Sequence, residues 1–207
     1  MVEKIKSEGI SPSVLVTPEV RVALREFFTK DSRERMAFLH GEIDEKRLVL
    51  TVKDITIPPQ ISAASTVDLD TDSDPEAYFE YHDELMAKHK VVPVIGQAHS
   101  FTGGAHHSPR DDGNDVLLAS IGQREGGRTM FLSITTSSLK AKDDFRCDVV
   151  VTPPGMSHYN IVHEDVEWRF LADSKEVTRM LEGSEERVKY AVVKKQEASP
   201  TGSASKK

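Results

Sequence analysis

The pattern of apolar and polar residues near the start of the chain predicts a strand followed by an amphipathic helix. Residues 14–16 are all apolar, and Thr17 and Pro18 then provide the N-cap and the first-turn proline that begin many helices. The acid Glu19 suits the first turn of that helix. Apolar residues recur after it at helical spacing, at Val20, Leu24, Phe27 and Phe28. One face of this helix should therefore be buried.

Two apolar segments with a polar stretch between them predict a β-hairpin. Residues 35–40 form a short apolar run that ends at Gly41, and residues 47–57 alternate between apolar and polar side chains. The polar residues 42–45 are expected to make the turn between the two strands. The Pro-Pro pair that follows should end the second strand, because proline cannot donate a backbone hydrogen bond.

The segment 60–73 is rich in Ser, Thr and Asp, and we expect it to be a solvated loop. Aspartates alternate through and just beyond it as in a calcium-binding loop, at Asp68, Asp70, Asp72 and Asp74. The EF-hand pattern fails, however, because Pro75 stands where glycine is needed and Tyr81 where the bidentate glutamate should be. We expect a helix over 75–88 instead, with two histidines on its surface that are too far apart to share a metal, His82 and His89.

The second half of the chain predicts a central strand with further strands and helices around it. Residues 91–98 are apolar without alternation, as in a central strand, and His99 should lie at its end. Further elements are expected in this order: a helix over 115–121, strands over 129–136, 145–151 and 168–171, and a helix over 174–194. This mixture predicts an α/β fold with a curved mixed sheet and flanking helices. We expect a main domain over 1–172, a helical extension over 173–195 and a disordered tail over 196–207.

Composition and charge narrow the classes of function. Of the 207 residues, 38% are hydrophobic and 29% are charged, as in soluble globular proteins. The formal charge of −7 argues against nucleic acid or an anionic membrane as a partner, since both need a positive protein surface. No apolar run is long enough to span a bilayer, and no secretory signal stands at the N-terminus, so we expect a cytoplasmic protein. The single cysteine, Cys147, excludes an intrachain disulfide and is expected to be buried.

Three separated segments carry residues that could form one catalytic site. Glu34 precedes the first hairpin strand, His99 follows the central strand, and Ser108 begins a Ser-x-x-Asp sequence at a helix start. That sequence ends at Asp111, and Asp112 stands beside it. A catalytic zinc ion is held by three protein ligands and one open position, while a glutamate outside the ligand shell deprotonates the bound water. The carboxylate, the imidazole and the Ser-x-x-Asp sequence could therefore supply the general base and the metal ligands of such a site.

Each of these residues also has a purely structural interpretation. Glu34 could be an acid at a strand edge that pairs with Arg33 or Arg35. His99 could be a hydrogen-bonded histidine at the end of a buried strand, and Ser108 could simply begin a helix whose first turn favours acids. Their joint presence in this order favours a site.

The order and spacing resemble the JAMM (MPN+) family of zinc isopeptidases. That family has a glutamate seven residues before a glycine, as Glu34 stands before Gly41. It then has His-Ser-His-Pro followed by Ser-x-x-Asp, where this chain reads His-Ser-Phe-Thr from His99 and Ser-x-x-Asp from Ser108. The resemblance covers residues 12–150. It implies an MPN (cytidine-deaminase-like) fold and cleavage of peptide or isopeptide bonds in conjugates of ubiquitin-like or other small modifiers.

The resemblance also implies roles for the residues. His99 and either Asp111 or Asp112 would hold zinc, because the loop before the helix is about one residue shorter than in the family and leaves both aspartates open. Glu34 would act as general base and then protonate the leaving amine, and Ser108 would hydrogen-bond the oxyanion.

One departure from the family pattern affects the metal. Phe101 stands where the family has its second histidine, and phenylalanine cannot bind zinc. His106 or His107, in the glycine-containing loop that follows, could complete the ligand shell. The alternative is an MPN-type scaffold or interaction subunit that has lost its metal. The expected partner is thus a protein substrate, a ubiquitin-like modifier or a larger assembly, and the sequence leaves the oligomeric state open.

Overall fold

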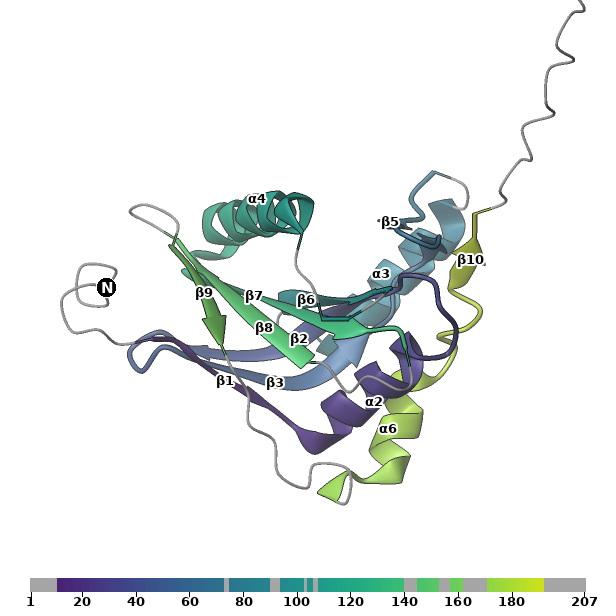
Figure 1. The fold of residues 1–207 in the computed structure, drawn as a ribbon, viewed down its shortest axis with the longest axis horizontal. Helices are drawn as coiled ribbons and strands as arrows, with labels where there is room; N and C mark the ends of the chain where they lie inside the picture. The colour runs from purple at the N-terminus through teal and green to yellow at the C-terminus, as the bar shows by residue number, and fades with distance from the viewer. Residues whose placement is uncertain are drawn as a thin grey trace, which may run out of the picture.

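The computed structural model describes residues 11–72, 75–89, 94–102, 104–105, 108–139, 145–152, 157–161 and 171–191. These residues form a curved, nearly closed mixed sheet with flanking helices (Figure 1). Its seven strands lie in the order β1-β3-β2-β6-β7-β8-β9, and a smaller sheet has the order β10-β4-β5. The predicted α/β class is confirmed, with the curved mixed sheet that the element order implied.

The described elements have the following bounds. The main sheet contains β1 (Ser13–Val16), β2 (Met36–Asp44), β3 (Val49–Thr56), β6 (Val94–Phe101), β7 (Met130–Ser137), β8 (Phe145–Val151) and β9 (Ser157–Ile161). The small sheet contains β4 (Gln60–Ser62), β5 (Val67–Leu69) and β10 (Val188–Tyr190). The helices are α2 (Pro18–Phe28), α3 (Pro75–His89), α4 (Pro109–Gly126) and α6 (Ser174–Leu181).

The first strand and helix form as predicted. The Thr17 side chain accepts a hydrogen bond from the Val20 backbone N–H, and Pro18 occupies the first turn of α2. The apolar face of α2 is buried against β3, β6 and β7, and α6 packs beside it on the same face of the sheet. Helix α4 covers the opposite face over β7 and β8 (Figure 1).

The predicted hairpin is present, but its turn was placed wrongly. β2 continues through Gly41 to Asp44, and the turn occupies residues 45–48 instead of 42–45. The pairing of β2 with β3 shifts register between His40 and Gly41, so the strand passes the glycine instead of ending there. A side chain at Gly41 would meet the Thr51 backbone oxygen, which explains why glycine stands at this close approach.

Segment 60–73 is not a simple loop, because it contains β4 and β5. The helix predicted over 174–194 is also wrong in part: α6 ends at Leu181, and residues 188–190 form β10. Gly183 has a left-handed backbone (φ 66°) just after α6, which favours glycine and turns the chain away from the helix axis. β10 then pairs in parallel with β4. The C-terminal part therefore joins the small sheet as well as packing against α2.

The remaining predictions have mixed outcomes. Helix α3 is confirmed, and the side chain of His82 is exposed on it. The predicted strands over 129–136 and 145–151 correspond to β7 and β8, whereas β9 was not predicted. Of the strand predicted over 168–171, only Leu171 lies among the described residues, and it is helical. The tail over 196–207 lies outside the described residues.

The core lies between the concave face of the main sheet and the helices α2 and α6. It includes Phe27 and Phe28 of α2, Met180 of α6, and strand residues such as Leu132. Cys147 is fully buried in this core, as predicted, and burial raises the pKa of its thiol. None of the described helices is both long enough and apolar enough to cross a membrane.

Candidate functional site

Glu34 lies just before β2, where the small sheet fixes its backbone. Its N–H donates to the Ala63 carbonyl at 2.8 Å, and its carbonyl oxygen accepts a hydrogen bond from the Ser62 hydroxyl. The residue is only 6% exposed, and no hydrogen bond from the described residues reaches its buried Oε1 atom. The structure therefore fixes the backbone of Glu34 at the start of β2 and leaves one oxygen of its carboxyl group without a hydrogen-bond partner among the described residues.

His99 lies within β6, opposite Met36 of β2 and Thr135 of β7. The prediction that it follows the end of the strand was wrong, because β6 continues to Phe101. Alternate residues of a strand share one face, so Phe101 stands beside His99 on the pocket side of the sheet. Ser100, on the other face, ties β6 to the segment before β2: its Oγ accepts from the Arg35 N–H at 3.0 Å.

Ser108 and Asp111 form the cap that begins α4. The Ser108 hydroxyl oxygen accepts a hydrogen bond from the Asp111 N–H, and the Asp111 Oδ2 accepts from the Ser108 N–H at 2.8 Å. The same Oδ2 lies 3.7 Å from His99 Nε2. Asp112 is exposed and does not line the pocket. Of the two aspartates that the sequence left open, Asp111 is therefore the one that faces His99.

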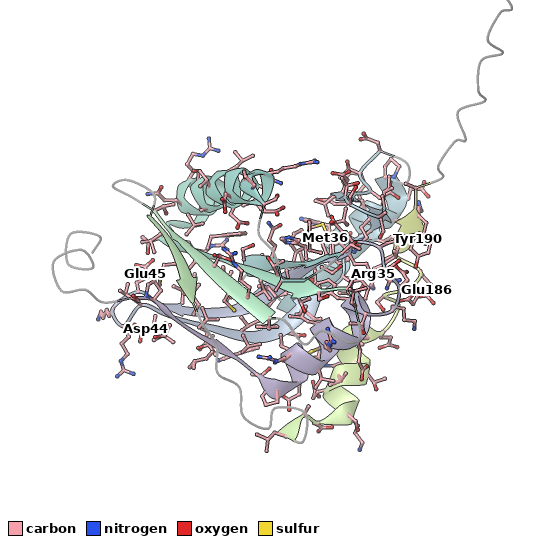
Figure 2. The ribbon with its side chains drawn as sticks, viewed as in Figure 1. Arg35, Met36, Asp44, Glu45, Glu186 and Tyr190 are labelled. Carbon is pink, nitrogen blue, oxygen red and sulfur yellow. The ribbon has the colours of Figure 1, made fainter. Side chains whose placement is uncertain are left out.

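These side chains line one pocket of about 270 Å³, between β5 on one side and the start of α4 on the other. Met36, labelled in Figure 2, contributes to its floor from β2. The lining residues are Glu34, Met36, Ser65, Thr66, Val67, Asp68, Leu69, Gln97, His99, Phe101, Ser108, Arg110, Asp111, Asn114, Leu117 and Leu118. The structure thus brings together four of the predicted site residues from three distant segments.

The pocket changes the acidity of its carboxyl groups. Burial raises the pKa of Glu34 from an ordinary 4.5 to about 7, the nearby charge of Asp111 adds to this, and His99 and Arg110 oppose it. Burial would also raise the pKa of Asp111, but the His99 imidazole and the Ser108 cap outweigh it and hold that pKa well below its usual range. At neutral pH the site therefore contains one carboxyl group that can exchange a proton and one that stays ionised.

The structural interpretations of Glu34 do not match the observed contacts. Arg35 is fully buried and bonds Asp31 and Glu185 instead, and its guanidinium also donates to the Tyr190 hydroxyl (Figure 2). The guanidinium of Arg33 lies over the ring of Tyr190, 3.9 Å from its centre. Both arginines thus face β10, away from the pocket that Glu34 lines.

In the described part of the chain, the pocket offers fewer metal ligands than a catalytic zinc site needs. His99 and Asp111 are suitable donors, and the 3.7 Å between their atoms leaves room for an ion to contact both. Phe101 also lines the pocket and has no donor atom. Among the residues that the structure describes, no three His, Cys, Asp or Glu side chains are grouped so that they could hold a metal. His106 and His107 lie outside the described residues.

Sequence reasoning missed several residues of the pocket. Gln97 lies two residues before His99 on the same face of β6, so strand alternation could have identified it. Its amide donates to Asp115 of α4 at 2.9 Å. The pocket residues of β5, such as Leu69, could not have been found this way, because no strand was predicted there.

Comparison with known proteins does not assign the chain to a family. No model of a known protein family matches the chain, and no curated protein matches it either. Any function must therefore be argued from the geometry of the pocket and from the resemblance of its residues to the JAMM motif.

Proposed function

We propose that the chain is a hydrolase of the JAMM type with an MPN-like fold, which cleaves peptide or isopeptide bonds in conjugates of ubiquitin-like or other small modifiers. One observation carries the proposal: Glu34, with a pKa of about 7, shares a pocket with His99 and Asp111. A general base works best when its pKa lies near the operating pH, and ordinary glutamates are far more acidic.

The residues of the chain supply the proton transfers and the stabilisation of charge. Glu34 would take a proton from the attacking water at its open Oε1 and return it to the leaving amine. The Ser108 hydroxyl already accepts a hydrogen bond from Asp111, which leaves its own hydrogen to donate to an oxyanion. The Asp111 carboxylate, 3.7 Å from His99 Nε2, would share a bound cation with the imidazole.

Zinc fits this pocket only if a third ligand joins the two donors present. His99 and Asp111 would hold the ion, and His106 or His107 would complete the shell, as the sequence suggested. When bound, zinc would lower the pKa of a coordinated water toward neutrality.

A second function has an observation in its favour. Phe101 lines the pocket at the position of a ligand, as it would in an MPN-type scaffold that has lost its metal. Such a scaffold would keep the fold and the buried Glu34 but have no hydrolytic activity.

Zinc content and hydrolysis of modifier conjugates distinguish the two functions. We expect wild-type protein purified without chelators to carry about one zinc per chain and to cleave such a conjugate. His99→Ala should lose both properties. Phe101→His should bind zinc more tightly, because it places an imidazole beside His99 on the same strand face. Leu15→His, at an exposed position on β1, is the matched control and should change neither.

Each outcome selects one proposal. A wild-type protein without zinc, whose Phe101→His variant acquires it, would be a scaffold with a decayed site. If Phe101→His also fails to bind zinc, the resemblance to the JAMM site is wrong. If His99→Ala keeps the wild-type zinc content, the metal lies elsewhere in the chain.

A further inference from the structure

The pocket extends along β6 beyond the residues that the proposed chemistry uses. Gln97 lines it two residues before His99, on the same face of the strand. The side chain is half-buried, and its amide donates a hydrogen bond to Asp115. A polar group in such a position can bind substrate without taking part in the proton transfers.

Asp115 fixes the orientation of the Gln97 amide. Its Oδ1 accepts a hydrogen bond from Gln97 Nε2 at 2.9 Å, and Asp115 is a fully buried residue of α4. Because the NH₂ group of Gln97 is the donor in this hydrogen bond, it faces Asp115. The Oε1 of Gln97 is then left as a hydrogen-bond acceptor in a fixed place, which keeps the entropic cost of binding low.

Three leucines line the same pocket as this acceptor. Leu117 and Leu118 of α4 and Leu69 of β5 line the same pocket, and Leu117 is 56% exposed. An exposed leucine at a pocket wall gains free energy when an apolar group covers it. An acidic group would be disfavoured here, because the carboxyl groups that line the pocket (Glu34, Asp68 and Asp111) outnumber its one arginine, Arg110.

We propose that this end of the pocket binds an apolar residue of a peptide chain. Gln97 Oε1 accepts a hydrogen bond from the backbone N–H of that residue, and its side chain packs against Leu69, Leu117 and Leu118. Asp115 is a positioning residue that acts through Gln97. The inference rests on the proposed function in one respect, since it assigns an apolar residue next to the bond that the hydrolase would cleave.

Binding of small probes tests the subsite without any turnover. We would titrate the ¹⁵N- and methyl-labelled protein with N-acetyl-leucine N′-methylamide, with its analogue methylated at the leucine nitrogen, and with N-acetyl-aspartate N′-methylamide. We expect the leucine probe to shift the Gln97 side-chain amide and the Leu117 methyls. Loss of one hydrogen bond should make the methylated analogue bind about fivefold to tenfold more weakly. The aspartate probe should bind more weakly still.

Variants separate positioning from a merely structural role. Gln97→Met keeps the size of the side chain but removes the acceptor, so the penalty for methylating the probe should disappear. Asp115→Asn retains an acceptor for the Gln97 amide and should preserve the wild-type preference. Gln123→Met, the same change outside the pocket, is the matched control and should behave as wild type.

The results also separate this inference from the hydrolase proposal. If the methylation penalty persists in Gln97→Met, if the aspartate probe binds as well as the leucine probe, or if wild type binds neither, the subsite is overturned. If the leucine probe binds as expected to a protein with no zinc and no hydrolytic activity, the subsite stands and the hydrolase proposal fails.

Discussion

Replacement of Glu34 by glutamine should stabilise the fold, and by more at high pH than at low pH. Burial raises the pKa of Glu34 from 4.5 to about 7, so the folded state resists ionisation of this carboxyl group more than the unfolded state does. Below pH 4.5 the carboxyl is neutral in both states and carries no penalty. As the pH rises through about 7, the buried carboxyl loses its proton in the folded state as well. The penalty for burying its charge then lowers the free energy of unfolding by about 3 kcal/mol. Glutamine has the same shape and no charge.

The difference in free energy of unfolding between Glu34→Gln and wild type should be about 2.5 kcal/mol larger at pH 8 than at pH 5. Urea denaturation of both proteins at these two pH values, with a chelator present to remove metal, measures it. Glu26→Gln removes an exposed carboxylate from α2 and is the matched control, with the same small effect expected at both pH values. If the difference in free energy of unfolding between Glu34→Gln and wild type stays constant or shrinks as the pH rises, the pKa of the Glu34 carboxyl is not raised.

Two further perturbations test the frame around the pocket. Arg35→Ala should lower the free energy of unfolding by about 3–5 kcal/mol, because it leaves a cavity in place of a fully buried side chain and breaks its ion pairs with two partly exposed carboxylates. Arg47→Ala removes an exposed pair and should cost less than about 1 kcal/mol. Equal losses in urea denaturation would contradict this assignment. Gly41→Ala should be strongly destabilising, since the new Cβ would lie 1.8 Å from a backbone oxygen of β3. Gly113→Ala meets no neighbour within 4 Å in α4 and should stabilise by up to about 1 kcal/mol; thermal melts compare the two.

Local chemistry explains which elements the sequence predicted well. Thr17 and Pro18 specify the start of α2 through a side-chain hydrogen bond and a fixed backbone angle, and both effects act within one helical turn. The Ser108 cap of α4 was found for the same reason. These signals need no knowledge of what packs against the helix.

The errors fall where distant contacts decide the structure. The strands β4 and β5 have only three residues each and little apolar alternation, and they form because β10, more than a hundred residues later, pairs with β4. Gly41 was taken as a strand end, although the glycine is there because β3 approaches closely at a register shift. Neither effect leaves a periodic pattern in the local sequence.

The candidate site was partly predictable because its residues follow the chain order of the JAMM motif that the sequence resembles. Sequence alone could not choose between Asp111 and Asp112, since both suit the first turn of a helix. The choice between them follows from the start of α4 at Ser108. With the helix capped there, Asp111 turns back to bond the Ser108 N–H and faces β6, whereas Asp112 points outward. Strand alternation places Gln97 on the same face as His99, but only the fold brings its hydrogen-bond partner Asp115 near it.

The small sheet connects the C-terminal part of the chain to the proposed general base. Gln60 and Ser62 of β4 are fully buried: Gln60 hydrogen-bonds both backbone groups of Met36, and Ser62 holds the Glu34 carbonyl. The backbone of β4 is in turn held by the last described segment, because the Gln60 N–H donates to the Arg187 carbonyl and the Ala191 N–H to the Ser62 carbonyl. The pocket residues of β5 pair with the other edge of β4. A change in β10 would therefore reach both Glu34 and the opposite wall of the pocket through β4, although no residue of β10 lines that pocket.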